Sequence, residues 1–163
     1  MTITVYLALG ANLGDRAGAI AAALDRLPAR GVTVEAVSPT YETDAVTPEP
    51  QPPYLNAVAR ATTALPARAL LGVCLAIERD LGRRRPPGRP QAPRELDIDL
   101  LLYGAAVIDA PPDLLVPHPR LLARPFVRIP LADVATPELR HPVTGERLDL
   151  AVPDPGVRRQ AGA

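Results

Sequence analysis

The stretch Pro93-Arg-Glu-Leu-Asp-Ile-Asp-Leu-Leu-Leu-Tyr103 places two carboxylates inside an otherwise apolar run. In an extended strand, side chains alternate between two faces, so Asp97 and Asp99 would project together while Leu96, Ile98 and Leu100 take the other side. Two like charges on a half-buried strand repel and lose solvation, which a divalent cation between them would offset. On this stretch alone, a metal site and a solvated edge strand are about equally supported, because D-x-D is a short motif.

The residues before this strand form a basic, proline-rich segment. Residues 83–94 contain five arginines and four prolines. This composition excludes a helix or a central strand, so we predict a stiff, arginine-bearing loop. Such a loop beside a carboxylate pair suits a polyphosphate that carries its own magnesium. The alternative is a solvated basic loop, which is the more frequent role of an arbitrary Arg-rich segment.

The overall composition indicates one soluble domain. The 163 residues are 47% apolar, which is enough to bury a single core. Basic and acidic residues balance at 18 each, so no net charge draws the chain to nucleic acid or to a membrane surface. No stretch has the length of a membrane span, and the N-terminus lacks an export-signal pattern. We expect a cytoplasmic monomer that binds neither nucleic acid nor a membrane.

Hydrophobic periodicity predicts the order of the elements. Alternation indicates strands over residues 2–9, 32–41, 54–63 and 96–103, and helical spacing indicates helices over 15–27 and 66–81. The order strand, helix, strand, strand, helix, strand is the split βαβ arrangement. We therefore predict an α+β fold with a ferredoxin-like βαββαβ core, in which one antiparallel sheet carries both helices on one face. Cys74, on the apolar side of the second helix, is predicted to be a buried hydrophobe rather than a nucleophile.

Two segments between these elements are predicted to be irregular. The glycines of residues 10–14 match neither the dinucleotide fingerprint nor the P-loop, so we interpret this segment as a turn. Residues 42–53 contain four prolines and no periodicity, and loops of this length are often functional.

The pattern loosens beyond residue 104. A short helix is predicted over residues 125–134, with Phe126, Ile129 and Leu131 facing inward, and a small hairpin over 141–150. We expect a single domain over residues 1–152 and a disordered tail over 153–163.

Five short motifs occur in an order that resembles one enzyme family. They are Leu9-Gly-Ala-Asn-Leu-Gly-Asp-Arg16, Glu42-Thr43, Gln51 with Tyr54-Leu-Asn56, Ala92-Pro-Arg94 with Asp97-Ile-Asp99, and Val116-Pro-His118 with Arg124-Pro-Phe126. Across residues 2–150 they resemble the 6-hydroxymethyl-7,8-dihydropterin pyrophosphokinases of folate biosynthesis, and five ordered motifs are more specific than any one. The resemblance implies a ferredoxin-like core with C-terminal additions. It also implies transfer of the pyrophosphoryl group of ATP to the pterin hydroxymethyl group, with release of AMP.

The resemblance implies catalytic roles for four residues. Asp97 and Asp99 correspond to magnesium ligands, and two Mg²⁺ ions held there would neutralise the polyphosphate and orient its β-phosphorus for in-line attack. Arg83 and Arg94 correspond to basic residues whose guanidinium groups stabilise charge that moves onto the AMP leaving group. No residue stands out as a general base.

The resemblance also implies a nucleotide site. His118 and Arg124 resemble contacts to the nucleotide phosphates, Glu78 resembles a residue on the nucleotide side, and Arg84 or Arg85 would assist. The plain alternative for His118 is a turn histidine that caps backbone groups. For Glu78 it is a solvated helix face.

A pterin site has a physical argument besides the resemblance. A flat ring with donors and acceptors along one edge needs aromatic faces and an amide that both donates and accepts. Tyr54, Asn56 and Phe126 supply these groups, and Thr43 and Val46 would join them from the long loop. The alternative is that Tyr54 and Phe126 are ordinary core residues.

The chain departs from the family pattern ahead of the acid pair. The family usually has Trp-Gly before the Pro-Arg of this motif, where this chain has Gln91-Ala92 and contains no tryptophan. We expect the missing tryptophan to affect how the loop over residues 83–94 closes over the nucleotide. It would therefore change the reaction rate and the affinity for ATP more than the type of reaction. One alternative function is a catalytically impaired relative that binds nucleotide and pterin. Another is an RNA-binding module on the same scaffold, against which the 3% aromatic content and zero net charge argue.

Overall fold

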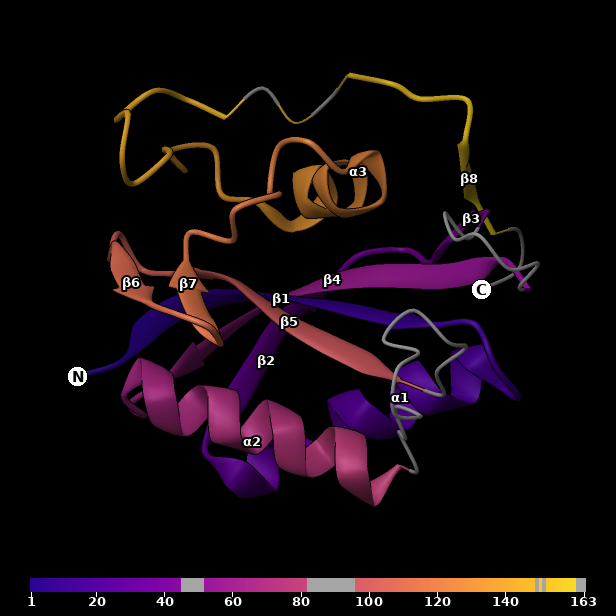
Figure 1. Ribbon diagram of the computed structural model, residues 1–163, viewed down its shortest axis with the longest axis horizontal. Coiled ribbons are helices and arrows are strands. Elements are labelled where there is room, and N and C mark those ends of the chain that lie inside the picture. The colour runs from indigo at the N-terminus through magenta and orange to yellow at the C-terminus, as the bar shows by residue number, and fades with distance from the viewer. Residues whose placement is uncertain (45–51, 82–95, 149, 151, 161–163) are drawn as a thin grey trace.

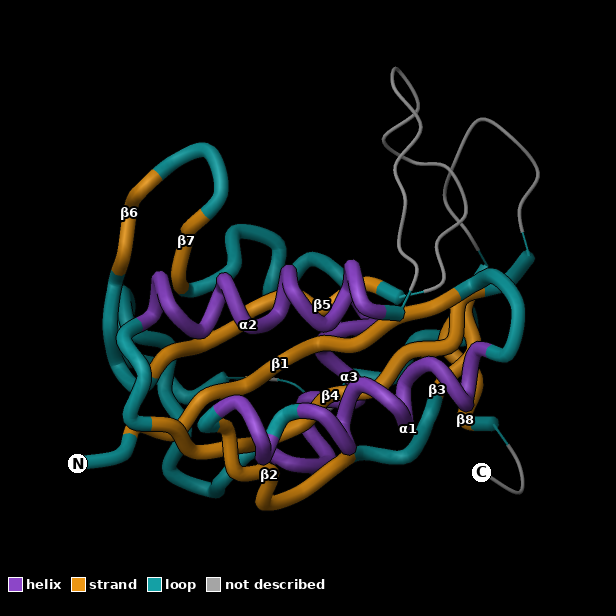
Figure 2. The backbone as a smooth tube through the Cα atoms, turned by 90° about the horizontal axis from the view of Figure 1, so that it is seen from below, coloured by secondary structure: helices purple, strands orange, loops and turns teal. Residues whose placement is uncertain are grey.

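The computed structural model describes residues 1–44, 52–81, 96–148, 150 and 152–160, in which a sheet separates two layers of helix (Figure 1). The strands are β1 (Ile3–Ala11), β2 (Val32–Val37), β3 (Tyr41–Thr43), β4 (Tyr54–Thr63), β5 (Asp97–Tyr103), β6 (Ile108–Ala110), β7 (Leu114–Val116) and β8 (Val157–Arg159). The helices are α1 (Arg16–Arg26), α2 (Ala67–Asp80) and α3 (Pro125–Val134), with a 3-10 helix η1 (Pro28–Arg30). Helices α1 and α2 lie together on one face of the sheet, and α3 lies on the other (Figures 1 and 2).

The sheet is antiparallel throughout the described residues. Five of its six strands pair in the order β5-β1-β4-β3-β8, and the sixth, β2, pairs with β4. One edge of β4 therefore faces β1, and the other faces β2 and β3 in succession. The strands predicted over residues 54–63 and 96–103 are confirmed, and the first predicted strand continues to Ala11.

The single strand predicted over residues 32–41 is wrong, because the chain forms two strands there. At the break, Ser38 Oγ donates to the Pro39 carbonyl at 2.8 Å and accepts from the Val58 amide at 2.9 Å. Pro39 has no amide proton with which to continue the pairing, so the strand breaks there. The Ser38 hydroxyl takes the place of a backbone carbonyl as the acceptor for the Val58 amide of β4. The loop expected from residue 42 begins later, because Glu42 and Thr43 still pair with β4.

The larger core lies between the sheet and helices α1 and α2. Val5, Leu7 and Leu9 point into it from β1, as their alternation predicts. The helices contribute Ile20, Ala23 and Leu27 from α1, and Leu70, Cys74 and Ile77 from α2. Each fully buried aliphatic side chain contributes about 2 kcal/mol by its removal from water. The prediction of both helices on one face and of a buried Cys74 is confirmed.

Local sequence sets where these helices begin and end. The Asp15 side chain accepts from the Gly18 amide at 3.0 Å and so caps the N-terminus of α1. After η1, Gly31 has a φ of 87°, a left-handed conformation that glycine adopts without steric cost. Pro66 stands immediately before α2, where its missing amide proton leaves no helical hydrogen bond unmade.

A smaller core lies on the opposite face, under α3. The predicted bounds of this helix are confirmed, but its predicted inward residues are only partly right. Leu131 is buried, whereas Phe126 and Ile129 are half-buried. The buried stripe is instead Val127, Pro130, Leu131 and Val134, which follows the i, i+3, i+4, i+7 spacing of one helix face. This stripe packs against Tyr6, Val58 and Leu101 of the sheet.

The described C-terminal residues, 152–160, contribute a strand to the sheet within the segment 153–163, where we expect a disordered tail. Val157–Arg159 form β8, which pairs with β3, and the Gln160 amide donates to the Thr40 carbonyl at 2.9 Å. Its pairing partner, β3, is more than 100 residues away in sequence. Hydrophobic periodicity, which depends on neighbouring residues, therefore does not predict this strand. In the described part of residues 141–150, where a small hairpin is expected, an antiparallel bridge joins Arg140 to Arg147, and the His141 amide donates to the Glu146 carbonyl at 2.8 Å. No described helix is long and apolar enough to cross a membrane.

Candidate functional site

The acid pair lies on the sheet face opposite α1 and α2. Leu96, Ile98 and Leu100 are buried in the larger core, so Asp97 and Asp99 project to the other side, as predicted. Both carboxylates are half-buried at the start of β5. Side chains two residues apart on a strand are about 7 Å apart at their Cα atoms, close enough for two carboxylates to share bound cations.

Glu78 is buried and reaches this strand from the end of α2. Its side chain is 3% exposed, and its Oε2 atom accepts from the Ile98 amide at 2.8 Å. The alternative that placed it on a solvated helix face is therefore wrong. Glu78 therefore fixes the backbone between the two aspartates.

The thiol of Cys74 lies in the buried core near these carboxylates. Its burial, followed by the charges of Glu78 and Asp99, raises its pKa to about 12, so this thiol stays neutral.

The acid pair fits magnesium as an incomplete ligand set. Among the residues that the structure describes, no three His, Cys, Asp or Glu side chains gather as a metal site. Magnesium is commonly held by one or two carboxylates together with substrate phosphates and water, so two aspartates suffice when a polyphosphate supplies other oxygens.

Thr43 and Asn56 meet on the same face of the sheet. Asn56 Nδ2 donates to Thr43 Oγ1 at 3.0 Å and approaches the Tyr41 carbonyl at 3.5 Å. The side chains of Thr43 and Asn56 are buried, and Thr43 pairs with Tyr54 in the β3–β4 register. The structure thus brings together three of the predicted pterin residues.

Gly10 lies between this group and the acid pair. In the strand register it faces Asn56 on β4 and Asp97 on β5. A Cβ atom on Gly10 would lie 3.2 Å from Asn56 Oδ1 and 3.8 Å from the Tyr54 ring. The absence of a side chain therefore keeps space beside the amide of Asn56.

Phe126 comes to this face from α3. Its ring packs beside the smaller core, and the Arg124 guanidinium carbon lies 5.6 Å from the ring centroid. At this distance a guanidinium and an aromatic ring attract each other. One predicted nucleotide residue and one predicted pterin residue are thus in contact.

His118 is a neutral histidine that caps its own turn. Its Nδ1 atom accepts from the Arg120 amide at 3.1 Å, and its backbone amide donates to the Leu101 carbonyl at 2.9 Å. Burial, with the charges of Arg124 and Arg120, lowers its pKa to about 4. Because Nδ1 accepts, the proton of the neutral ring is on Nε2, which is a hydrogen-bond donor. The capping role that the sequence allowed is present.

Five predicted site residues lie outside the described residues. They are Val46, Arg83, Arg84, Arg85 and Arg94.

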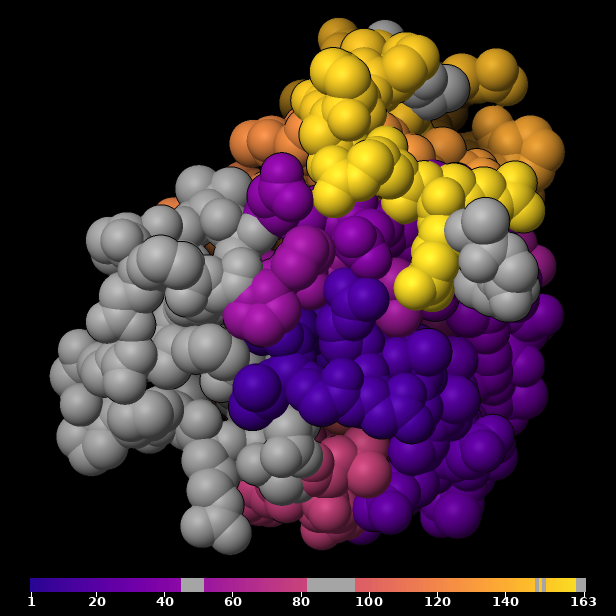
Figure 3. Space-filling model, turned by 90° about the vertical axis from the view of Figure 1, so that its right-hand side faces the viewer, coloured from indigo at the N-terminus to yellow at the C-terminus, as the bar shows by residue number. Residues whose placement is uncertain are grey.

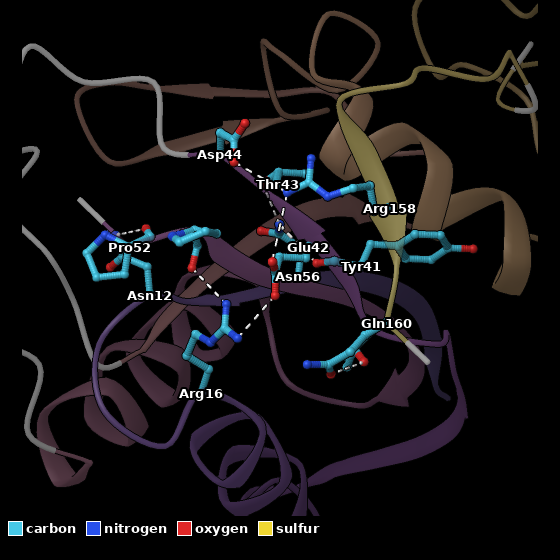
Figure 4. Close-up of polar contacts among 12 residues, drawn as sticks. Asn12, Arg16, Tyr41, Glu42, Thr43, Asp44, Pro52, Asn56, Arg158 and Gln160 are labelled. Carbon is cyan, nitrogen blue, oxygen red and sulfur yellow. Dashed lines mark hydrogen bonds and ion pairs between the residues drawn. The ribbon is translucent and has the colours of Figure 1, made fainter. Parts of the chain in front are cut away.

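A polar cluster at the end of β3 and β4 was not predicted (Figure 4). Arg16 donates to the Glu42 carboxylate at 3.1 Å and to the Pro53 carbonyl at 2.9 Å. Asn12, which is 1% exposed, donates to the Pro52 carbonyl at 3.2 Å. The signal is present in the sequence, since both residues belong to the motif over residues 9–16, but neither the turn predicted there nor the family resemblance assigns them a contact.

These features define an α+β domain with a candidate small-molecule site at one end of its sheet. The site combines an acid pair, a hydrogen-bonded amide and aromatic rings on a single face. Such convergence of a few polar groups is typical of a binding or active site.

Comparison with known sequences identifies the family. The model of the 7,8-dihydro-6-hydroxymethylpterin-pyrophosphokinase (HPPK) family matches residues 6–136. The chain is 43% identical to the 2-amino-4-hydroxy-6-hydroxymethyldihydropteridine pyrophosphokinase of Pseudomonas aeruginosa, over 98% of both chains. It is also 43% identical to the same enzyme of Methylorubrum extorquens, over 94% of this chain and 96% of that one. The chain belongs to the HPPK family.

Longer relatives contain the same region. The chain is 38% identical to the folic acid synthesis protein fol1 of Pneumocystis carinii, over 86% of this chain but 18% of that protein. The wild-type HPPK-DHPS of Plasmodium falciparum has the same fold, with a TM-score of 0.65 at 14% identity. That likeness covers 90% of this chain and 43% of that one.

Proposed function

We propose that this chain transfers the pyrophosphoryl group of ATP to the hydroxymethyl group of 6-hydroxymethyl-7,8-dihydropterin, giving AMP and the pterin pyrophosphate. The observation that carries the proposal is the row Asp97, Gly10 and Asn56 across β5, β1 and β4. Neighbouring strands are about 4.8 Å apart, so the acid pair and the amide lie about 10 Å from each other. This spacing suits a polyphosphate and a pterin ring bound side by side.

The acid pair would hold the phosphate end of the substrates. We assign Asp97 and Asp99 as the ligands of two Mg²⁺ ions, which when bound would neutralise the polyphosphate. The hydroxymethyl oxygen would release its proton to solvent and form a bond to the β-phosphorus as the bond from that phosphorus to the AMP oxygen breaks, with the electron pair leaving on AMP. Glu78 holds the backbone between the aspartates, and this rigidity favours positioning, which supplies most of the catalysis in phosphoryl transfer.

The pterin and nucleotide would lie on either side of this centre. On the pterin side, Asn56 would offer its amide to the ring edge, supported by Thr43, while Tyr54 and Phe126 would pack on the ring faces. On the nucleotide side, neutral His118 would donate from Nε2, and Arg124 would supply positive charge to phosphate oxygens. Roles for Val46 and for Arg83, Arg84, Arg85 and Arg94 stay predictions of the sequence.

We also infer that the core is ferredoxin-like. The order β5-β1-β4-β2, all antiparallel, with α1 following β1 and α2 following β4, supports this inference. The single-domain assignment, the monomeric state and the cytoplasmic location stay predictions.

The proposal is tested by AMP release from ATP and Mg²⁺, with and without the pterin. We expect pterin-dependent AMP from the native protein and a loss of about 100-fold or more for Asp97→Asn and Asp99→Asn, because each removes charge that balances the polyphosphate. Asp109→Asn, at an exposed position on β6, is the matched control and should retain full activity. Full activity of the acid-pair variants would exclude the metal assignment. Binding of both ligands by the native protein without AMP release would instead indicate a binding module.

A further inference from the structure

One arginine joins the two strands that carry the predicted pterin residues. Arg16 is the first residue of α1. Its Nη2 atom lies 3.1 Å from Glu42 Oε2 on β3 (Figure 4). Its Nη1 atom donates at 2.9 Å to the carbonyl of Pro53, just before β4. A planar guanidinium offers donors on separate nitrogens in a fixed geometry, which a lysine ammonium does not. One side chain therefore fixes the ends of two strands.

Both anchoring points are next to residues of the predicted pterin site. Glu42 precedes Thr43, and Pro53 precedes Tyr54, and these two residues pair in the register. Side chains on a strand alternate, so Glu42 faces α1 while Thr43 faces Asn56 on the other side. Arg16 therefore acts from behind the site and does not contact a ligand bound on the Thr43 side.

The C-terminal strand β8 makes a second set of polar contacts with the β3–β4 end. Arg158 on β8 lies 3.3 Å from Asp44 Oδ1 and 3.8 Å from Glu42 Oε1, and its neighbour Val157 pairs with Thr43. Figure 3 shows the C-terminal residues, in yellow, lying against the magenta β3–β4 end. Arg158 is more exposed than Arg16, with 47% of its side chain accessible against 25%. Because water screens exposed charges, Arg158 should stabilise the β3–β4 end less than Arg16 does.

We propose that Arg16 is a positioning residue for pterin binding, aided by Arg158. It holds the β3–β4 end so that Thr43 and Asn56 keep the spacing that the ring requires. The proposal rests on the pterin site proposed above and adds residues that neither touch the ligand nor carry the chemistry. It implies that the two substrates respond differently when Arg16 is changed.

The test compares KM for the pterin, KM for ATP, kcat and the melting temperature among variants. For Arg16→Ala we expect a rise of about tenfold in the pterin KM, the effect of losing one charge-assisted hydrogen bond, with the ATP KM within about twofold. Arg16→Lys retains the charge but not both contacts, so its pterin KM should lie between those of the native protein and Arg16→Ala. Arg158→Ala should raise the pterin KM about twofold. Arg68→Ala breaks an exposed pair with Asp113 elsewhere and should change neither KM.

Two further variants separate the possible failures. Glu42→Gln removes the charge but keeps an acceptor for Arg16, and it should raise the pterin KM by about threefold. Asn56→Ala tests the proposed pterin site itself. If Asn56→Ala raises the pterin KM and Arg16→Ala does not, the positioning role is excluded and the site stands. If Asn56→Ala has no effect, the pterin site is wrong. Equal rises in both KM values for Arg16→Ala would show a general structural role and overturn the proposal.

Discussion

Gly10 shows how one absent side chain shapes the site. It stands in the middle strand of the row that joins the acid pair to Asn56. Its backbone is that of an ordinary strand, so the requirement for glycine is space rather than a left-handed conformation. The nearest atom to a new Cβ would be the oxygen of the Asn56 amide, at 3.2 Å. A methyl group here would displace the amide that the pterin is proposed to contact.

Gly10→Ala should therefore weaken pterin binding without unfolding the protein. We expect the pterin dissociation constant, measured by calorimetry, to rise about five- to tenfold, the equivalent of one impaired hydrogen bond. Gly72→Ala is the control, because a Cβ at this exposed position of α2 meets no atom within 4 Å. That variant should gain about 0.5–1 kcal/mol of stability, since glycine weakens a helix. Unchanged pterin affinity in Gly10→Ala would contradict the proposed place of the ring.

At the scale of elements, local signals located most of the fold. The alternation of β4 and the apolar stripe of α2 gave element types that the structure confirms, because both patterns are long and regular. The division of β2 from β3 was missed, since it depends on a contact between Ser38 and β4. The pairing of β8 was missed for a similar reason, because its few polar residues become a strand only against the edge of β3.

A tyrosine hydroxyl joins β3 to α3. Tyr41 donates to Asp133 Oδ2 at 2.6 Å. Burial, together with the hydrogen bond to Asp133 and its charge, raises the pKa of Tyr41 from 10.0 to about 12. The folded protein therefore favours the neutral hydroxyl. This contribution to stability is complete below pH 10 and is lost as the pH rises from 10 towards 12, where the unfolded chain releases the proton first.

Tyr41→Phe should lower the free energy of unfolding by about 1 kcal/mol at pH 8, because it removes a hydrogen bond to the Asp133 carboxylate, which is exposed and can then be solvated by water. Chemical denaturation at pH 8 and pH 11 measures the difference between variant and native protein, which should shrink at the higher pH. Tyr103→Phe, which removes a 2.6 Å hydrogen bond to the Leu65 carbonyl, is the control for loss of one tyrosine hydroxyl. A difference that stays constant between the two pH values would argue against the role of Tyr41 ionisation.

At the scale of the molecule, the proposed site assembles residues from distant parts of the chain. Asp97, Asp99, Thr43, Tyr54 and Asn56 could be proposed from sequence because each belongs to a short motif. The contacts that hold them could not, since Arg16 and Glu42 are 26 residues apart and Arg158 and Asp44 are 114 apart. A motif identifies residues that could bind a substrate or a metal ion, whereas only the folded sheet shows which other side chains hold those residues in place.

The row across β5, β1 and β4 also limits the length of an acceptable substrate. Backbone hydrogen bonds fix the distance between strands, so the separation of the acid pair from the ring site can change only through side-chain rotamers and not through movement of the strands. An analogue with a hydroxyethyl group in place of the hydroxymethyl group should still bind through its ring, but its hydroxyl would overshoot the β-phosphorus. We expect such a compound to inhibit AMP release competitively with the pterin, and to be a substrate at no more than about a hundredth of the normal rate.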